Sequence, residues 1–191
     1  MAVIAAGQSA SEQSNLSAAI TASDNNAAEA LWSSLGGGQQ AAQAADAQLR
    51  DAGDTRTQVQ PSRLLTGYTP FGQTYWSLID QVRFTAGMAC TEAGAQVLGL
   101  MAQVVSGQRW GLGSLAGAQI KGGWGPGIHP GQGDGWMERQ MGVVSIAGQP
   151  VAVALASTAG DHSTGIRSLD AMAAWLADHL HASGLARQPR C

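Results

Sequence analysis

The sequence has little charge, almost no lysine and no long apolar run. Charged residues make up 12% of its 191 residues, and the formal net charge is −3. The arginines are scattered singly along the chain, so no basic surface of the kind that binds nucleic acid is predicted. No apolar stretch approaches the roughly 20 residues of a transmembrane helix, and none is expected. The first residues lack the charged region of a signal peptide.

The rest of the composition is that of a globular protein. Hydrophobic residues account for 45% of the chain, which is too many for a disordered segment. A chain of this length forms one domain, or two lobes that share one core.

Cysteine is scarce, and its use is ambiguous. Cys90 and Cys191 are the only two cysteines in the chain. They either pair, which would hold the C-terminal end in place, or remain unrelated thiols with Cys90 buried on a helix. His129 and His162 lack the Cys/His/Asp spacing of metal sites, so we expect no metal and no cofactor.

The hydrophobic periodicity predicts helices first and strands later. Apolar residues recur at helical spacing in the first half, whereas two β-branched runs joined at Gly148 indicate a hairpin. Between the two patterns, residues 54–73 form a polar loop of a length that is usually functional or mobile. The expected helices are residues 9–22, 26–35, 39–51, 74–88, 91–105 and 167–181, and the expected strands are 118–124, 139–146 and 151–158.

Lys121 is the single lysine among ten cationic residues. A lysine ammonium is a compact charge whose pKa changes readily on burial, whereas a guanidinium stays charged. Lys121 is therefore a candidate functional group, although codon bias alone would also leave a chain with few lysines.

Ser23-Asp24-Asn25 lies between two predicted helices. Taken alone, such a triplet is typical of a helix cap. At a junction between helices it can also direct a hydroxyl and a carboxamide into a cleft. If Ser23 and Lys121 meet there, they can pass a proton to a leaving nitrogen, while Asn25 donates to a substrate amide. The alternative is a plain cap and a strand-terminal lysine.

Three further residues are candidates for substrate contact. Gly123 would let a substrate approach the backbone closely. We expect Trp124, its neighbour, to lie in the cleft. Arg139 either meets a substrate carboxylate or stands exposed at the end of its strand.

These motifs resemble those of the penicillin-recognising serine hydrolases, in particular the class A β-lactamases. Residues 16–28 around Ser23-Asp24-Asn25, then Gly36-Gly37 and residues 49–54, are similar to the central part of that family. Lys121-Gly122-Gly123 resembles its Lys-Thr/Ser-Gly strand. The resemblance runs from about Glu12 to Leu180. It implies an α/β (α+β) fold with a helical lobe, residues 9–117, beside antiparallel strands and a C-terminal helix, residues 118–191.

The chain also departs from the family pattern. The Ser-x-x-Lys motif that supplies the nucleophile is absent, because no serine precedes Lys121 by three residues. Gly122 stands where the family has a hydroxyl residue, and loop 54–73 contains no glutamate to drive deacylation. We therefore expect a truncated copy, with exposed Leu, Ile and Val side chains on residues 9–22 and 139–158 where the family's first strands would pack.

The resemblance implies a serine hydrolase that forms acyl-enzymes from amide, ester or β-lactam substrates. Its implied catalytic residues are Ser23 and Lys121, and its implied substrate-binding residues are Asn25, Gly123, Trp124 and Arg139. The expected partner is a small-molecule or peptidoglycan-like substrate, the expected location is secreted or cell envelope, and the complete protein would be monomeric. Because the nucleophile motif is missing, this chain is expected to be inactive. The alternatives are a non-catalytic binding module of the same fold and an incomplete gene product.

Overall fold

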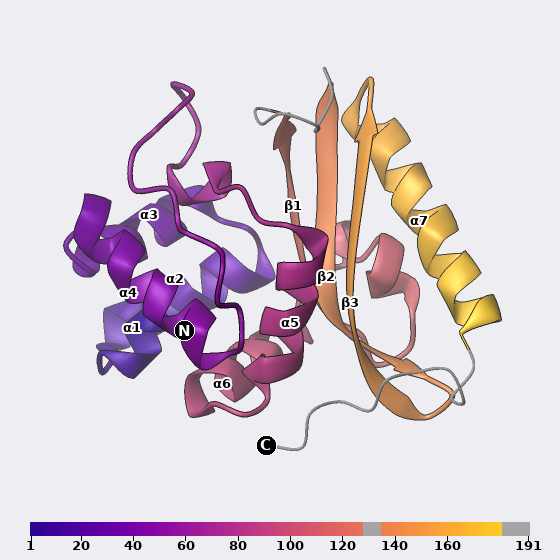
Figure 1. Cartoon of the computed structure of the whole chain (residues 1–191), viewed down its shortest axis with the longest axis horizontal. Helices are drawn as coiled ribbons and strands as arrows, with labels where there is room; N and C mark the ends of the chain where they lie inside the picture. Colours follow the sequence, from indigo (N-terminus) through magenta and orange to yellow (C-terminus); the bar gives the residue numbers. More distant parts are fainter. Residues whose placement is uncertain (128–134, 181–191) are drawn as a thin grey trace.

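A lobe of helices lies beside an antiparallel sheet whose far face is covered by one long helix (Figure 1). The computed structural model describes residues 1–127 and 135–180. The helical lobe contains α1 (Ala2–Ala5), α2 (Ala10–Thr21), α3 (Asn25–Ser34), α4 (Gly38–Asp51), α5 (Leu78–Met88) and α6 (Glu92–Met101). Short 3-10 turns occur at Phe71–Gln73, Ser106–Gln108 and Gly111–Ser114.

The sheet has three strands in the order β1-β2-β3, all antiparallel. They are β1 (Gln119–Pro126), β2 (Trp136–Ile146) and β3 (Gln149–Ala159), and α7 (His162–His179) follows. Ala147 and Gly148 connect β2 to β3 with φ values of 50° and 75°. Two such residues form the tight turn that suits the twist of a hairpin. The antiparallel sheet and the final helix packed on it are therefore confirmed.

The sheet separates two apolar cores. On one face, α7 buries Leu169 and Ala173 against Ile120, Val144 and Leu155. On the other face, Met141 and Val143 of β2 pack against the helical core. Because successive side chains of a strand point to opposite faces, the register decides which β1 residues face the helical lobe. Lys121 pairs with Met141, so it shares the face toward the helical lobe.

Several element boundaries differ from the predicted ones. Helix α5 begins after Ser77, whose hydroxyl accepts from Asp80 N, because the Thr74 hydroxyl instead accepts from Gln60 N. Helix α6 ends at Met101, four residues earlier than predicted. Helix α7 begins at His162, because Asp161 caps it by accepting from Thr164 N. The predicted start of this helix, Arg167, is therefore five residues too late.

Other differences concern residues for which no helix or strand was predicted. Strand β1 continues through Gly125 and Pro126, beyond the predicted end at residue 124. The short helix α1 was not predicted. His129 and Cys191 lie outside the described residues, and so does the proposed Cys90–Cys191 pairing.

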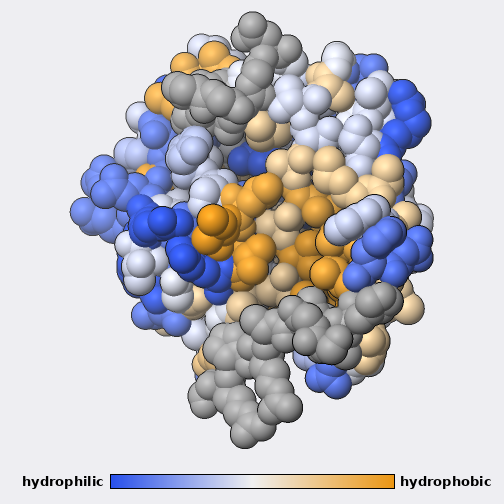
Figure 2. Space-filling view, turned by 45° about the vertical axis from the view of Figure 1, so that its right-hand side comes forward, coloured by the Kyte–Doolittle hydropathy of each residue, from blue (hydrophilic) through white to orange (hydrophobic). Residues whose placement is uncertain are grey.

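The expected position of exposed apolar residues was wrong. No large hydrophobic residue of 9–22 or 139–158 is strongly exposed; Trp124 of β1 is exposed, and so are residues of the flanking helices α5 and α7. Ile79 of α5 is 61% exposed and Trp175 of α7 is 56% exposed. Both helices pack on β3, and Figure 2 shows a contiguous apolar surface on this side of the molecule. Within the described ranges, no helix is long and apolar enough to cross a membrane.

Candidate functional site

Ser23 occupies the sharp turn between α2 and α3. Its φ of 57° lies in the left-handed region, which is uncommon for a residue other than glycine. Ala22 N and Asp24 N both donate to Ala18 O, at 3.0 and 3.3 Å, and these bonds close the end of α2. Asp24 Oδ1 accepts from Ala27 N at 2.9 Å and caps α3. The cap interpretation therefore holds for Asp24, whereas the Ser23 side chain is left to point toward β1.

Lys121 and Ser23 meet across the junction of the two lobes. Lys121 Nζ donates to Ser23 Oγ at 2.5 Å and to Gly122 O at 2.7 Å, although 98 residues separate Lys121 from Ser23. The predicted contact between their polar atoms is confirmed. Burial lowers the pKa of the Lys121 ammonium from 10.5 to about 8, because a charged amine loses solvation at this position.

Gln108 completes the hydrogen-bonded chain. Ser23 Oγ donates to Gln108 Oε1 at 2.7 Å, and Gln108 Nε2 donates to Ala22 O at 3.0 Å. The amide is oriented by the Ala22 carbonyl, which can only accept. The direction of donation along these hydrogen bonds is thus fixed, from the Lys121 ammonium to the Ser23 hydroxyl and from that hydroxyl to the Gln108 carbonyl. Sequence analysis missed Gln108, and no local pattern marks a lone glutamine in a glycine-rich connection.

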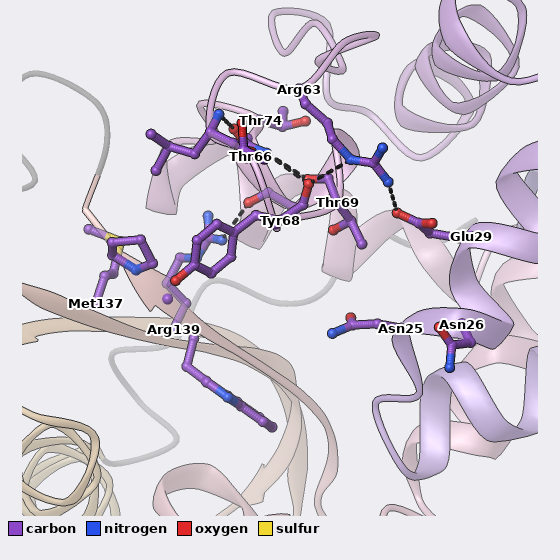
Figure 3. Close-up of a pocket in the computed structure, with 17 residues that line it drawn as sticks. Asn25, Asn26, Glu29, Arg63, Thr66, Tyr68, Thr69, Thr74, Met137 and Arg139 are labelled. Carbon is purple, nitrogen blue, oxygen red and sulfur yellow. Dashed lines mark hydrogen bonds and ion pairs between the residues drawn. The ribbon is translucent and has the colours of Figure 1, made fainter.

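A pocket of about 560 Å³ lies next to this row of hydrogen bonds. Figure 3 shows the residues that line the pocket. Three of the candidate residues line it: Asn25, Trp124 and Arg139. Ser23, Lys121 and Gly123 are not among its lining residues, although Asn25 follows Ser23 by two positions and Trp124 follows Lys121 by three. The structure therefore places the hydrogen-bonded pair of Ser23 and Lys121 next to the pocket, and not in its wall.

The opposite wall of the pocket belongs to the loop over residues 63–74, part of the long polar loop predicted from the sequence. The buried side chain of Gln73 organises this loop. Its Oε1 accepts from Leu64 N and Leu65 N, at 2.9 and 2.6 Å. Its Nε2 donates to three carbonyls of the loop, those of Leu65, Tyr68 and Thr69, at 3.1–3.2 Å. One side chain thus replaces the regular secondary structure that the loop lacks.

Two arginines tie the loop to its surroundings. Arg63 Nη2 pairs with Glu29 of α3, and Arg63 Nε donates to Tyr68 O at 3.0 Å (Figure 3). Arg139 Nη2 donates to Gly72 O at 3.2 Å. Burial lowers the pKa of Arg139. Among the described residues no carboxylate forms an ion pair with Arg139, so its guanidinium lines the pocket without a counter-ion.

The indole of Trp124 packs on the face of the sheet that α7 covers. Its ring centroid lies 6.2 Å from that of Trp110 and 5.4 Å from that of His162. Trp110 in turn packs against Gly122, where an added Cβ atom would lie 3.1 Å from the indole. Trp110 therefore occupies the space that a hydroxyl side chain at Gly122 would need. Within the described ranges, no cluster of three His, Cys, Asp or Glu side chains could hold a metal ion.

Comparison with known proteins identifies solved structures that share this architecture. No protein-family model matches the sequence, and no curated protein matches it. The extended-spectrum β-lactamase TLA-3 superposes with a TM-score of 0.64 and 13% identity, over 87% of this chain and 63% of that chain. A mutant of the chromosome-encoded β-lactamase of Vibrio parahaemolyticus gives 0.63 and 19%, over 91% and 67%. An ancestral class A β-lactamase gives 0.60 and 22%, over 88% and 65%.

This chain thus spans about two thirds of the length of the proteins it superposes on, or slightly less. The superposition covers both lobes, because about nine tenths of the described architecture is included. At identities of 13–22% the similarity establishes the fold, and substrate and activity do not follow from it. The chain has the α+β fold of the class A β-lactamases.

Proposed function

We propose that the cleft between the lobes is the ligand site of a β-lactamase-like serine hydrolase, in which Ser23 and Lys121 form a proton relay. The observation that carries the proposal is the hydrogen bond from Lys121 Nζ to Ser23 Oγ, made by a lysine whose burial lowers its pKa to about 8. A group that titrates near neutral pH can both give and accept a proton under physiological conditions.

The direction of the hydrogen bonds from Lys121 through Ser23 supports transfer of a proton to a ligand. The Lys121 ammonium donates to the Ser23 oxygen, and the Ser23 hydroxyl donates to Gln108. When a leaving nitrogen replaces Gln108 as the acceptor, Ser23 delivers its proton to that nitrogen and is reprotonated by Lys121. The product of this step is a neutral lysine, which the buried site favours.

The pocket fits a small ligand that carries both an amide and a carboxylate. Asn25 offers a carboxamide at its rim, and the unpaired Arg139 guanidinium offers a bidentate donor for a carboxylate. Gly123 has open space around its Cα, with no atom within 4 Å of an added Cβ, so a ligand backbone can approach it. We propose a β-lactam, or an amide or ester related to peptidoglycan peptides, and we place the protein in the secreted or cell-envelope compartment as a monomer.

The 191 residues do not include two motifs that such an enzyme uses, the one that supplies the nucleophile and the glutamate that drives deacylation. No Ser-x-x-Lys sequence is present, and loop 54–73 has no glutamate. The Ser23 hydroxyl is already engaged on both sides, as acceptor from Lys121 and donor to Gln108. These observations favour a second candidate function, a binding module that retains the pocket without acyl transfer.

A binding and labelling experiment tests both candidates. Benzylpenicillin is titrated into the 191-residue chain by calorimetry, and the chain is incubated with a fluorescent penicillin and a chromogenic β-lactam. We expect reversible binding, no covalent label and no hydrolysis, because acyl-enzyme formation requires an activated nucleophile.

Matched arginine variants give the control. Arg139→Gln should weaken binding by about tenfold, the usual effect of losing one charged hydrogen-bonding partner. Arg167→Gln removes an arginine of α7 that, within the described part of the chain, bonds only its helix neighbours Ser163 and Thr164, and it should leave binding unchanged. Absence of binding by the unaltered chain would refute the ligand site. A penicilloyl adduct on Ser23 would refute its role as a relay.

A further inference from the structure

A fully buried carboxylate, that of Glu138, lies on the face of the sheet that α7 covers. Its exposed fraction is 0%. Glu138 Oε1 accepts a hydrogen bond from Trp136 Nε1 at 2.7 Å and contacts His162 Nδ1. Glu138 Oε2 has no hydrogen-bond partner in the described structure. Burying a carboxyl group is costly unless its oxygens are hydrogen-bonded, and in the described structure Trp136 and His162 supply the contacts to Oε1.

The first turn of α7 is shaped to bring His162 to this carboxylate. Gly165, in that turn, packs directly on the Glu138 side chain, and a Cβ atom at Gly165 would overlap Glu138 Cγ. Asp161 caps the same turn, and hydrogen bonds from Ser163 and Thr164 lower the pKa of its carboxyl. His162 therefore lies in the capped first turn of α7, where its imidazole contacts Glu138.

Three tryptophan rings surround the His162 imidazole. The ring centroids lie 5.4 Å away for Trp124 and 6.5 Å away for both Trp110 and Trp136. Aromatic rings at such separations attract one another in edge-to-face and tilted arrangements, which are the arrangements of these three pairs. The imidazole thus fixes the rings around it, and it is fixed in turn by Glu138.

Trp124 connects this group to the ligand pocket. It lies directly opposite Glu138 in the β1–β2 register, and together with Gly125 and Pro126 it forms the pocket wall contributed by β1. Strand β1 is at the edge of the described sheet, with β2 as its only neighbouring strand there. The end of an edge strand is held on one side only by backbone hydrogen bonds, so side-chain contacts decide its position.

We infer that Glu138 and His162 are positioning residues for the pocket. The buried carboxylate holds the imidazole, the imidazole holds the Trp124 indole against Trp110, and the indole fixes the end of β1. The expected effect of Glu138 and His162 on ligand binding rests on the proposed function. Their expected effect on the position of Trp124 is independent of that function.

Nuclear magnetic resonance of tryptophan-labelled protein tests the inference directly. The chain has six tryptophans, and the Trp124 indole signal is assigned with a Trp124→Phe variant. In His162→Phe an aromatic ring is kept and the contact of residue 162 with Glu138 is lost, whereas the bond from Trp136 can remain. We expect the Trp124 indole signal to shift and its hydrogen exchange to rise about tenfold, since the ring is then free to open locally.

His179→Phe is the matched control. His179 is on the same helix and stacks on Trp175 with ring centroids 4.6 Å apart, at the end of α7 remote from His162. It should leave the Trp124 signal unchanged. Affinity for benzylpenicillin should fall about tenfold in His162→Phe and stay within about twofold in His179→Phe.

A conservative variant separates positioning from general stability. Glu138→Gln keeps the volume and the acceptor oxygen, so the bonds from Trp136 and His162 can persist. It should retain a Trp124 signal closer to that of the unaltered protein than His162→Phe does, and it serves as the measured variant if His162→Phe does not fold. A Trp124 signal unaffected by His162→Phe, or equally altered by His179→Phe, would overturn the inference. If the unaltered chain binds no penicillin, the proposed function fails while the Trp124 measurements still decide this inference.

Discussion

Because Lys121 is the only lysine, its ionisation can be measured without interference from another lysine. Protein grown with lysine labelled at the ε carbon gives one side-chain signal for the whole chain. Its chemical shift, followed from pH 6 to 11, should show a midpoint near 8 instead of 10.5. The cause is burial of the ammonium, so Ser23→Ala should not restore the ordinary value, since it removes an acceptor and leaves the site just as buried.

The same shift has a consequence for stability. The unfolded chain binds the Lys121 proton with its ordinary pKa, whereas the folded chain releases it near pH 8. Between pH 8 and 10.5 the unfolded state therefore holds more protons, and the free energy of unfolding rises with pH. The shift from 10.5 to about 8 corresponds to a rise of at most about 3 kcal/mol.

Urea denaturation at pH 7.5, 9 and 10.5 measures this rise against Lys121→Met. Other titrating groups contribute equally to both proteins, so the difference between them isolates the lysine. If the unfolding free energies of the unaltered protein and of Lys121→Met change in parallel with pH, the conclusion that this ammonium is buried at the lobe junction is refuted. A titration midpoint above 10 for the labelled lysine would refute it as well.

Two further predictions concern Gly122 and the loop that lines the pocket. Gly122→Ser, which introduces the hydroxyl residue of the family pattern, should lower the free energy of unfolding by about 1–2 kcal/mol, because Trp110 occupies that space; chemical denaturation measures it, and an unchanged midpoint would contradict it. Gln73→Ala should increase trypsin cleavage after Arg63 and destabilise the protein by about 2 kcal/mol or more, because five backbone hydrogen bonds to the loop are lost. Cleavage at the rate of the unaltered protein would show that the loop does not depend on Gln73.

The fold could be predicted from the sequence wherever one pattern dominates locally. Alternating apolar residues on either side of Gly148 specify the hairpin, and helical spacing specifies α2 to α4 within one or two residues. The misplaced start of α5 arises because two residues are equally suited to a helix cap. Thr74 and Ser77 are both good caps, and only the tertiary bond from Gln60 N to the Thr74 hydroxyl decides between them.

The candidate site was predictable only in part, for a related reason. Ser23 and Lys121 stand out by motif and by rarity, and their contact follows from the family resemblance. Gln108 and Gln73 carry equally specific hydrogen bonds, but glutamine is common and no spacing marks these two. Their roles depend on backbone groups that come close only when the chain is folded.

The backbone at Ser23 has a strained conformation that contacts outside its turn explain. The position at the end of α2 has a φ of 57°, where glycine would be free of strain and serine is not. A strained residue persists where surrounding interactions determine its position. Here those interactions come from outside the turn, as Lys121 donates to the hydroxyl and Gln108 accepts from it. A plain cap would need neither partner, because Asp24 already caps α3. The strain at Ser23 is thus accounted for by its contacts across the lobe junction.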